Sequence, residues 1–271
     1  MKPANFSYIR AGSIEEAVEI MSRSDGEARF LSGGQSLIPA LNFRLGGPSL
    51  LIDLNSIPGL SGIRMEGAAI IIGALTRHTE LGHHPLISTH LPLLTEAVQH
   101  VAHPAIRNRG TFGGSLALAD PSAELPACVL ALRAVVKVVG PGGQRVIAAD
   151  DFFVGGYTTA LAPDELLTEV HIPLPNLSAR HGFAELTRRR GDYAMVGLAL
   201  MTGPQQRVVW FGLADRPLRD QAAEDALSGG PRAAAAAALS GSEVWGDLHA
   251  SAATKTHLAR VMIRRLLERI T

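Results

Sequence analysis

Two short stretches of the chain have residue types that suit an anion-binding turn. They are Ser32–Ser36 (SGGQS) and Thr111–Ser115 (TFGGS), and each places two adjacent glycines close to hydroxyl side chains and beside apolar residues. Without a Cβ, glycine can turn through positive φ and lets the backbone come close to a ligand. Successive backbone N–H groups in such a turn form a concave site for a phosphate. The pair predicts a phosphate-binding function, and two ordinary tight turns are the alternative interpretation.

Composition narrows the functional class. The chain has 271 residues, of which 46% are hydrophobic, and its formal net charge is zero. A sizeable core is therefore expected, and a basic surface for nucleic acid is not. The single cysteine, Cys128, lies in an apolar segment expected to be a buried helix, and one thiol cannot hold an iron–sulfur cluster. The first residues lack the apolar core of a signal peptide and no apolar run reaches membrane-spanning length, so we expect a cytoplasmic protein.

Metal-binding and other common catalytic motifs are not predicted. Four histidines cluster between residues 78 and 90, but no pair has the helical spacing and acidic partner of a zinc site. The sequence also lacks a Gly-x-Ser-x-Gly elbow, a Gly-x-Gly-x-x-Gly fingerprint and a P-loop. We therefore expect no metal and no acyl-transfer, Rossmann or nucleotide triphosphatase site.

Hydrophobic periodicity and turn signals divide the chain into three parts and indicate an α+β fold. Residues 1–55 are expected to form a β-α-β unit, with Ser13 and Glu16 at capping-box spacing. Its expected elements are a helix over 13–23, a strand over 28–31, a short helix over 36–41 and a strand over 50–54.

The other two parts are 56–175 and 176–271, with the boundary at a proline-bracketed stretch. In the second part we expect strands over 69–73, 134–139 and 165–172, a hairpin turn at 141–143 and helices over 90–101 and 124–132. In the third part we expect a three-stranded antiparallel meander from 182–188, 194–201 and 207–214, then helices over 218–227, 233–238 and 254–270.

The motifs, taken in order, resemble a known family. The stretches 32–39 (SGGQSLIP), 102–116 (AHPAIRNRGTFGGSL), 119–126 (ADPSAELP) and 188–194 (RRRGDYA) are similar to the FAD-binding medium subunit of the xanthine dehydrogenase / carbon monoxide dehydrogenase family of molybdenum hydroxylases. The resemblance covers nearly the whole chain. It implies the two-subdomain FAD-binding fold of the vanillyl-alcohol-oxidase (PCMH) type, followed by a C-terminal domain.

The resemblance also implies a set of cofactor-binding residues. FAD would lie non-covalently between the first two parts, because Gln35 cannot form the histidine–flavin bond of some flavin oxidases. Its pyrophosphate would rest on the first glycine stretch, completed by the second, and its flavin and ribityl chain would contact residues further along. The expected residues are Ser32, Gly33, Gly34, Gln35, Ser36, Leu37, Thr111, Gly113, Gly114, Ser115, Asp120 and Glu124, with Tyr193 near the isoalloxazine ring.

For three of these residues, a structural role is an alternative to contact with the cofactor. Asp120 precedes a proline and can serve only as a turn residue. Glu124 can be a helix N-terminal charge favoured by the macrodipole, and Tyr193 can be an ordinary core or surface aromatic. Many relatives have Asn in place of Ser115 and Asp in place of Glu124, so these two positions depart from the family pattern.

By the same resemblance, the partners are a large molybdopterin subunit and a small subunit with two [2Fe–2S] clusters, assembled as a dimer of heterotrimers. The chain would pass electrons from those clusters through FAD to an external acceptor, with no side chain acting as acid or base in substrate oxidation. Two other hypotheses stay open at this point. One is a self-sufficient flavin oxidase of the same fold, and the other is a non-catalytic ligand-binding or assembly protein.

Overall fold

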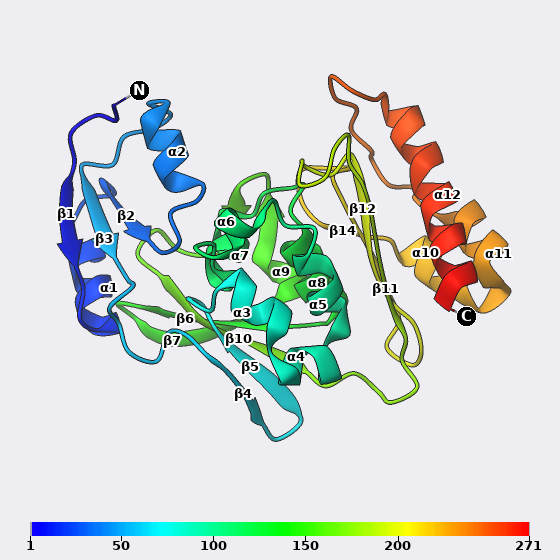
Figure 1. Cartoon of the computed structure of the whole chain (residues 1–271), viewed down its shortest axis with the longest axis horizontal. Coiled ribbons are helices and arrows are strands. Elements are labelled where there is room, and N and C mark those ends of the chain that lie inside the picture. The colour runs from blue at the N-terminus through cyan, green and yellow to red at the C-terminus, as the bar shows by residue number, and fades with distance from the viewer. Residues whose placement is uncertain (1, 271) are drawn as a thin grey trace.

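The computed structural model describes residues 2–270 and contains three β-sheets that follow one another along the chain (Figure 1). The first sheet has three strands, the second five and the third four, and a two-stranded ribbon accompanies the second. Helices occur in all three regions. The mixed helix and sheet confirms the predicted α+β class, while the subdomain limits at 55 and 175 stay predictions.

The first sheet is parallel. Its elements are β1 (Ser7–Arg10), α1 (Ile14–Ser22), β2 (Ala28–Leu31), α2 (Leu37–Asn42) and β3 (Leu50–Asp53), and the strand order is β1-β3-β2. The β-α-β unit is confirmed. Strand β1 was not predicted, because its four residues are all exposed at the sheet edge and show no buried alternation.

The N-terminus of α1 shows how the sequence determines this region. Ser13 is the N-cap, and its Oγ accepts a hydrogen bond from the N–H of Glu16 at 3.1 Å. The Glu16 carboxylate in turn accepts from the N–H of Gly12 at 2.7 Å. The first bond satisfies an amide that the helix itself leaves unpaired, and the second ties the residue before the N-cap to the first turn. The apolar residues Ala17, Val18 and Met21 then face the N-terminal core.

The second sheet is antiparallel and has the order β4-β5-β10-β6-β7. Its strands are β4 (Ile63–Glu66), β5 (Ala69–Gly73), β6 (Val135–Gly140), β7 (Gly143–Ala148) and β10 (Leu166–Pro173). The accompanying ribbon is β8 (Phe153–Gly155) with β9 (Thr158–Thr159). The helices are α3 (His78–His83), α4 (Pro85–His90), α5 (Pro92–Val98), α6 (Pro104–Arg107), α7 (Phe112–Leu118), α8 (Glu124–Ala131) and α9 (Ala149–Phe152).

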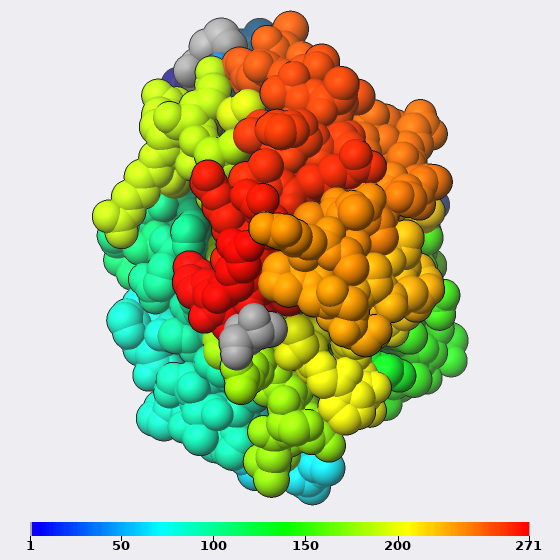
Figure 2. All heavy atoms as spheres, turned by 90° about the vertical axis from the view of Figure 1, so that its right-hand side faces the viewer, coloured from blue at the N-terminus to red at the C-terminus, as the bar shows by residue number. Residues whose placement is uncertain are grey.

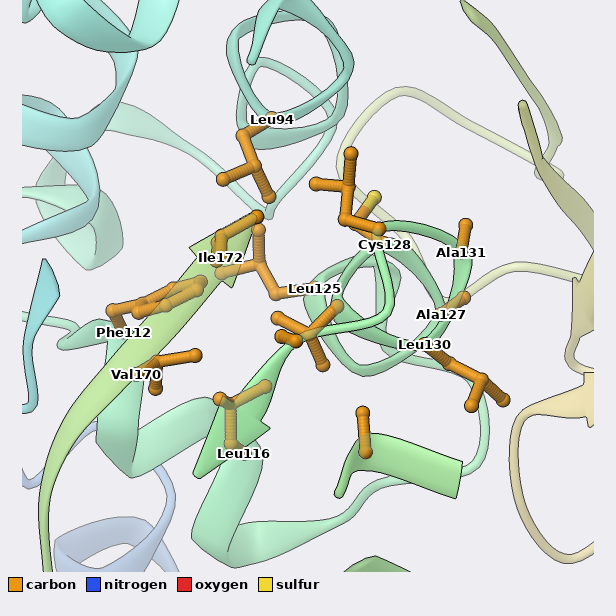
Figure 3. Close-up of a cluster of buried hydrophobic side chains, with 14 of the residues drawn as sticks. Leu94, Phe112, Leu116, Leu125, Ala127, Cys128, Leu130, Ala131, Val170 and Ile172 are labelled. Carbon is orange, nitrogen blue, oxygen red and sulfur yellow. The ribbon is translucent and has the colours of Figure 1, made fainter. Parts of the chain in front are cut away.

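Two helices of this region pack directly on the sheet. Figure 3 shows Phe112 and Leu116 of α7 beside Val170 of β10, with Leu125 of α8 close by. All four side chains belong to one buried hydrophobic cluster. Cys128 is fully buried in α8, as predicted. The predicted helix over 90–101 instead begins at Pro92, because His90 ends α4 and proline favours the first turn of a new helix.

The third sheet is an antiparallel meander of four strands, so the predicted count of three is wrong. Its strands are β11 (His181–Leu186), β12 (Val196–Met201), β13 (Arg207–Phe211) and β14 (Leu218–Arg219). The last strand occupies residues predicted to start a helix. Leu218 and Arg219 pair with β13, and Asp220 caps the following helix, which therefore begins at Gln221.

The third sheet is buried on both faces. Side chains of β12 alternate, so that Leu198 and Leu200 join the C-terminal core while Ala199 and Met201 join the core of the second region. The outer face is covered by α10 (Gln221–Ala226), α11 (Gly230–Ala237) and α12 (Ala252–Ile270), with a short 3-10 turn η1 (Leu227–Gly229) between the first two. Figure 2 shows α12 in red lying against α11 in orange on this side of the molecule. The sheet is thus clamped between two sets of helices.

Candidate cofactor site

The two glycine stretches lie in contact, although 79 residues separate Ser32 from Thr111. The Thr111 hydroxyl donates to Oγ of Ser32 at 3.2 Å. A Cβ on Gly33 would overlap the carbonyl oxygen of Arg109, and a Cβ on Gly114 would lie 2.5 Å from Thr111 Oγ1 and 2.8 Å from Ser32 Oγ. Only glycine allows the two backbones this approach. The first and second regions are therefore joined at the motifs themselves.

Polar side chains on both sides hold this junction. Asn55 Nδ2 donates to the carbonyl oxygen of Ser32 at 2.9 Å, and Arg77 Nη2 donates to Oδ1 of Asn55 at 2.7 Å. Arg77 Nη1 also donates to the carbonyl oxygen of Arg109, and Arg77 pairs with Thr111 in an isolated β-bridge. Asn55 and Arg77 were not singled out from the sequence, because nothing in their local pattern shows that they bridge two loops.

The first stretch leaves a row of unused amide donors. Among residues 2–270, no hydrogen bond engages the backbone N–H of Gly33, Gly34, Gln35 or Ser36. Gly34 has φ of +72°, and Gln35 Nε2 donates to the carbonyl oxygen of Gly33 at 2.9 Å, which fixes the turn. Ser36 is the N-cap residue of α2, which begins at Leu37. Consecutive N–H groups without partners, at a turn that leads into a helix, form a concave anion site.

The second stretch differs from the expected turn. Thr111 is the buried N-cap of α7, and Gly113 and Gly114 form the first helical turn with no positive φ. Their amides are already engaged, Gly113 N–H with the carbonyl of Ala74 at 2.8 Å and Gly114 N–H with Thr111 Oγ1 at 3.2 Å. The N–H of Ser115 donates to the Thr111 carbonyl at 3.0 Å. Gly113 and Gly114 therefore allow close packing of the backbone, whereas the N–H groups without a partner lie in the first stretch.

Helix α7 separates this junction from a second polar group. Its seven residues span about 10 Å, since an α-helix rises about 1.5 Å per residue. It ends at Leu118, its C-cap Ala119 has φ of +51°, and Asp120 follows. Asp120 is buried, and its two oxygens accept from Ser122 N–H at 2.9 Å and from the Tyr157 hydroxyl at 3.2 Å. The turn role considered for Asp120 is therefore present, together with a tyrosine that was not predicted.

Glu124 and Tyr193 lie close to Asp120. Burial raises the pKa of Glu124 to about 7, and the charge of Asp120 contributes. Partial desolvation and the charges of Asp120 and Glu124 raise the pKa of Tyr193, although this side chain is 70% exposed. Burial and Asp120 likewise raise the pKa of Tyr157 to about 12. The structure thus brings Asp120, Glu124 and Tyr193 together at the far end of α7, and their contacts to a flavin stay a prediction.

A further acid, Glu185 of β11, was missed from the sequence. Its side chain is only 2% exposed, and burial together with the Glu124 charge raises its pKa to about 8. No sequence signal marks Glu185, because its burial depends on how β11 packs against α5. Tyr157 had a weaker signal, since it follows a further glycine pair, Gly155 and Gly156. Within residues 2–270, no cluster of His, Cys, Asp and Glu has the geometry of a metal site.

The raised pKa values of Glu124 and Glu185 predict that stability falls as pH rises from 6.5 to 8. The unfolded carboxyls have ordinary values near 4.5, so in this window the folded chain binds more protons than the unfolded chain. The buried His78, whose pKa is lowered to about 4, has the opposite effect, but only below pH 6.5. We expect the melting temperature of the wild type to drop across this window.

The substitution Glu185→Gln should flatten that slope, because it removes the group with the larger shift. Glu165→Gln is the matched control, since Arg145 holds the pKa of Glu165 below its ordinary value and it stays ionised throughout. A slope that is the same in wild type and Glu185→Gln would show that Glu185 is not the titrating group.

Comparison with known proteins agrees with this geometry. Residues 4–175 match the family described as the FAD binding domain in molybdopterin dehydrogenase, and residues 181–270 match the CO dehydrogenase flavoprotein C-terminal domain. The 6-hydroxypseudooxynicotine dehydrogenase complex subunit alpha of Paenarthrobacter nicotinovorans is 42% identical over 98% of this chain and 95% of its own length. The carbon monoxide dehydrogenase medium chain of Hydrogenophaga pseudoflava is 36% identical over 98% of this chain and 97% of its own length.

Solved structures give the same result. Carbon monoxide dehydrogenase from Hydrogenophaga pseudoflava, in a form that lacks the Mo-pyranopterin moiety of the molybdenum cofactor, superposes with a TM-score of 0.94 at 37% identity, over 99% of this chain and 98% of that chain. Quinoline 2-oxidoreductase from Pseudomonas putida 86 superposes with a TM-score of 0.93 at 34% identity, with the same coverage. The relatives are oxidoreductase subunits. This chain therefore belongs to the FAD-binding medium subunits of the molybdenum hydroxylase family, the group that includes the carbon monoxide dehydrogenase medium chain.

Proposed function

We propose that this chain holds FAD non-covalently at the joined glycine stretches and passes electrons from [2Fe–2S] clusters of a small partner subunit to an external acceptor. A large partner subunit would carry molybdopterin and oxidise the substrate, with the three chains assembled as a dimer of heterotrimers. The names of the relatives, a medium chain and a complex subunit, support an assembly of this kind. The single cysteine agrees with clusters that lie elsewhere.

One observation carries the proposal: the four unpaired amides of residues 33–36 lie where Gly33 and Gly114 permit no Cβ. A diphosphate would be held by these N–H groups, since backbone donors in a turn are suited to a phosphate. The second stretch would contribute shape, because its own amides are engaged internally. The residues present therefore fit the phosphate part of FAD.

The far end of α7 would accommodate the flavin. Asp120 and Glu124 would contact the ribityl chain and the ring system, and the exposed Tyr193 would cover the ring. The hydrogen bond from Tyr157 keeps Asp120 in place. FAD itself supplies the redox chemistry, and the protein supplies position and electrostatics. No side chain of this chain needs to act on the substrate.

The two alternative functions receive no comparable support. A self-sufficient oxidase would need a cap domain, whereas the third sheet is buried between helices of its own region and those of the second region. A non-catalytic ligand-binding or assembly protein is disfavoured by the relatives, which are named as dehydrogenase subunits. The first test is therefore whether the chain binds FAD.

We expect purified apoprotein mixed with FAD to keep it through desalting and to release it in acid. Gly114→Val should weaken FAD binding at least about tenfold, equivalent to about 1.4 kcal/mol. The added atoms would displace Thr111 and Ser32 at the junction. Gly142→Val is the control, since no atom lies within 4 Å of a Cβ there. Both variants should be compared by flavin absorbance and by circular dichroism. Wild-type protein that does not bind FAD would disprove the proposal.

The subunit arrangement is tested separately. A tagged copy expressed in its native host should co-purify with one molybdenum-containing chain and one iron–sulfur chain, seen by metal analysis and mass spectrometry of the intact complex. Recovery of the tagged chain alone, with oxidation of an organic substrate unaided, would favour the self-sufficient oxidase instead.

A further inference from the structure

Arg77 is a half-buried cation without a carboxylate partner. It is the N-cap residue of α3, and its guanidinium donates to two neutral oxygens, the carbonyl of Arg109 and Oδ1 of Asn55. Among residues 2–270, no Asp or Glu lies within ion-pair distance of it. A guanidinium has five N–H donors, so three of them have no acceptor in this part of the chain. A partly desolvated cation of this kind is stabilised by an anion placed next to it.

The two hydrogen bonds place the guanidinium between the glycine stretches. Arg77 Nη1 donates to the carbonyl oxygen of Arg109, the same oxygen that a Cβ on Gly33 would overlap. On the other side, Nη2 donates to Asn55 Oδ1 at 2.7 Å, and Asn55 Nδ2 donates to the carbonyl oxygen of Ser32 at 2.9 Å. That carbonyl belongs to the same peptide group as the unpaired N–H of Gly33. The cation therefore lies beside the start of the row of unused amides.

The charged groups around Arg77 leave an excess of positive charge. Arg109 is exposed, and its guanidinium has no hydrogen bond or ion pair in the described part of the chain. Desolvation and the charge of Arg109 lower the pKa of Arg77, while Asp53 opposes them. The Asp53 carboxylate already accepts from the N–H of Asn55 at 2.9 Å and lies 3.8 Å from Arg10 Nε. Because Asp53 is shared in this way, the junction keeps uncompensated positive charge.

A diphosphate supplies what this junction lacks. Its oxygens carry full negative charge, whereas backbone N–H groups offer only partial positive charge. A guanidinium is well suited to phosphate, because its planar set of donors matches the phosphate oxygens and stays protonated. The amides of residues 33–36 and the Arg77 guanidinium therefore complement one another as ligands of one anion.

We propose that Arg77 is the charged ligand of the FAD diphosphate and that Arg109 assists it through its own charge. The inference rests on the proposed FAD function and gives both arginines a role beside the amides of residues 33–36. The diphosphate neutralises two like charges where the first and second regions meet. Asn55 and the Arg109 carbonyl hold the Arg77 guanidinium in place for this contact.

The role of Arg77 is tested by fluorescence titration of the apoprotein with FAD. Arg77→Gln removes the charge and should weaken FAD binding about tenfold to a hundredfold, the range for one charged hydrogen bond. Arg29→Gln is the control for the loss of a positive charge, because the Arg29 guanidinium donates to the carbonyls of Gly26 and Ala28 at the start of β2. This control should bind FAD as the wild type does. Equal FAD affinity in Arg77→Gln and wild type overturns the proposal.

Salt dependence separates a charged ligand from a residue that only supports the junction. Dissolved salt screens charges, so FAD binding to the wild type should weaken as NaCl rises toward about 0.5 M. The slope of log Kd against log salt concentration should be smaller in Arg77→Gln and restored in Arg77→Lys, which keeps the charge. Equal slopes in wild type and Arg77→Gln show a purely structural role and overturn the proposal.

Arg109→Gln keeps the test decisive if Arg77→Gln does not fold, because the Arg109 side chain is exposed. It should also reduce the salt slope, and a wild-type slope in this variant overturns the assisting role of Arg109. A chain that binds FAD equally well with and without the Arg77 charge disproves this inference alone. A wild-type chain that does not bind FAD disproves the proposed function and this inference with it.

Discussion

The contact between the two glycine stretches is the constraint on which the candidate site depends. Gly33 meets the backbone of Arg109, and Gly114 meets Thr111 and Ser32, at distances that leave no room for a Cβ on either glycine. The individual bonds are modest, since an N-cap such as Thr111 contributes about 1 kcal/mol. Their combined effect is geometric: they fix the free amides of residues 33–36 beside the start of α7, and α7 sets the distance to Asp120.

The packing of the third sheet against the second region also shapes the candidate site. Because β12 is apolar on both faces, it packs against its own helices and against the core of the second region at once. Further contacts hold the two regions together, such as the hydrogen bond from Gly212 N–H to the carbonyl of Pro121 at 2.9 Å. This packing brings Tyr193 near Asp120 and buries Glu185 near Glu124. The end of α7 that we propose for the flavin is therefore built from regions far apart in sequence.

Local signals in the sequence were sufficient for much of the fold. The Ser13–Glu16 capping box and the apolar stripe behind it predicted α1, and the β-branched run at residues 69–73 predicted β5. Strand β1 was missed because all four residues are exposed, and β14 was missed because two residues form a strand only by pairing with β13. Strands β1 and β14 form through contacts with strands elsewhere in the chain, and the hydrophobic periodicity of a short segment cannot predict such contacts.

The local geometry of the candidate site was predictable to a similar extent. The glycine pairs indicated close backbone approach, but a glycine pair does not tell positive φ from tight packing. The first pair has the turn, at Gly34, and the second has the packing, at Gly113 and Gly114. Residues whose role comes from distant neighbours had little or no signal, and Asn55, Arg77 and Glu185 are the examples.

Hydrogen–deuterium exchange of the apoprotein with and without FAD tests the central claim most directly. The unpaired amides of residues 33–36 should exchange quickly in the apoprotein and slow strongly when FAD is bound, and peptides covering 111–115 should slow with them. Peptides from α12 (Ala252–Ile270) should be unaffected and serve as the internal reference. Bound FAD with unchanged exchange at residues 33–36 would contradict the account, because the diphosphate would then lie elsewhere.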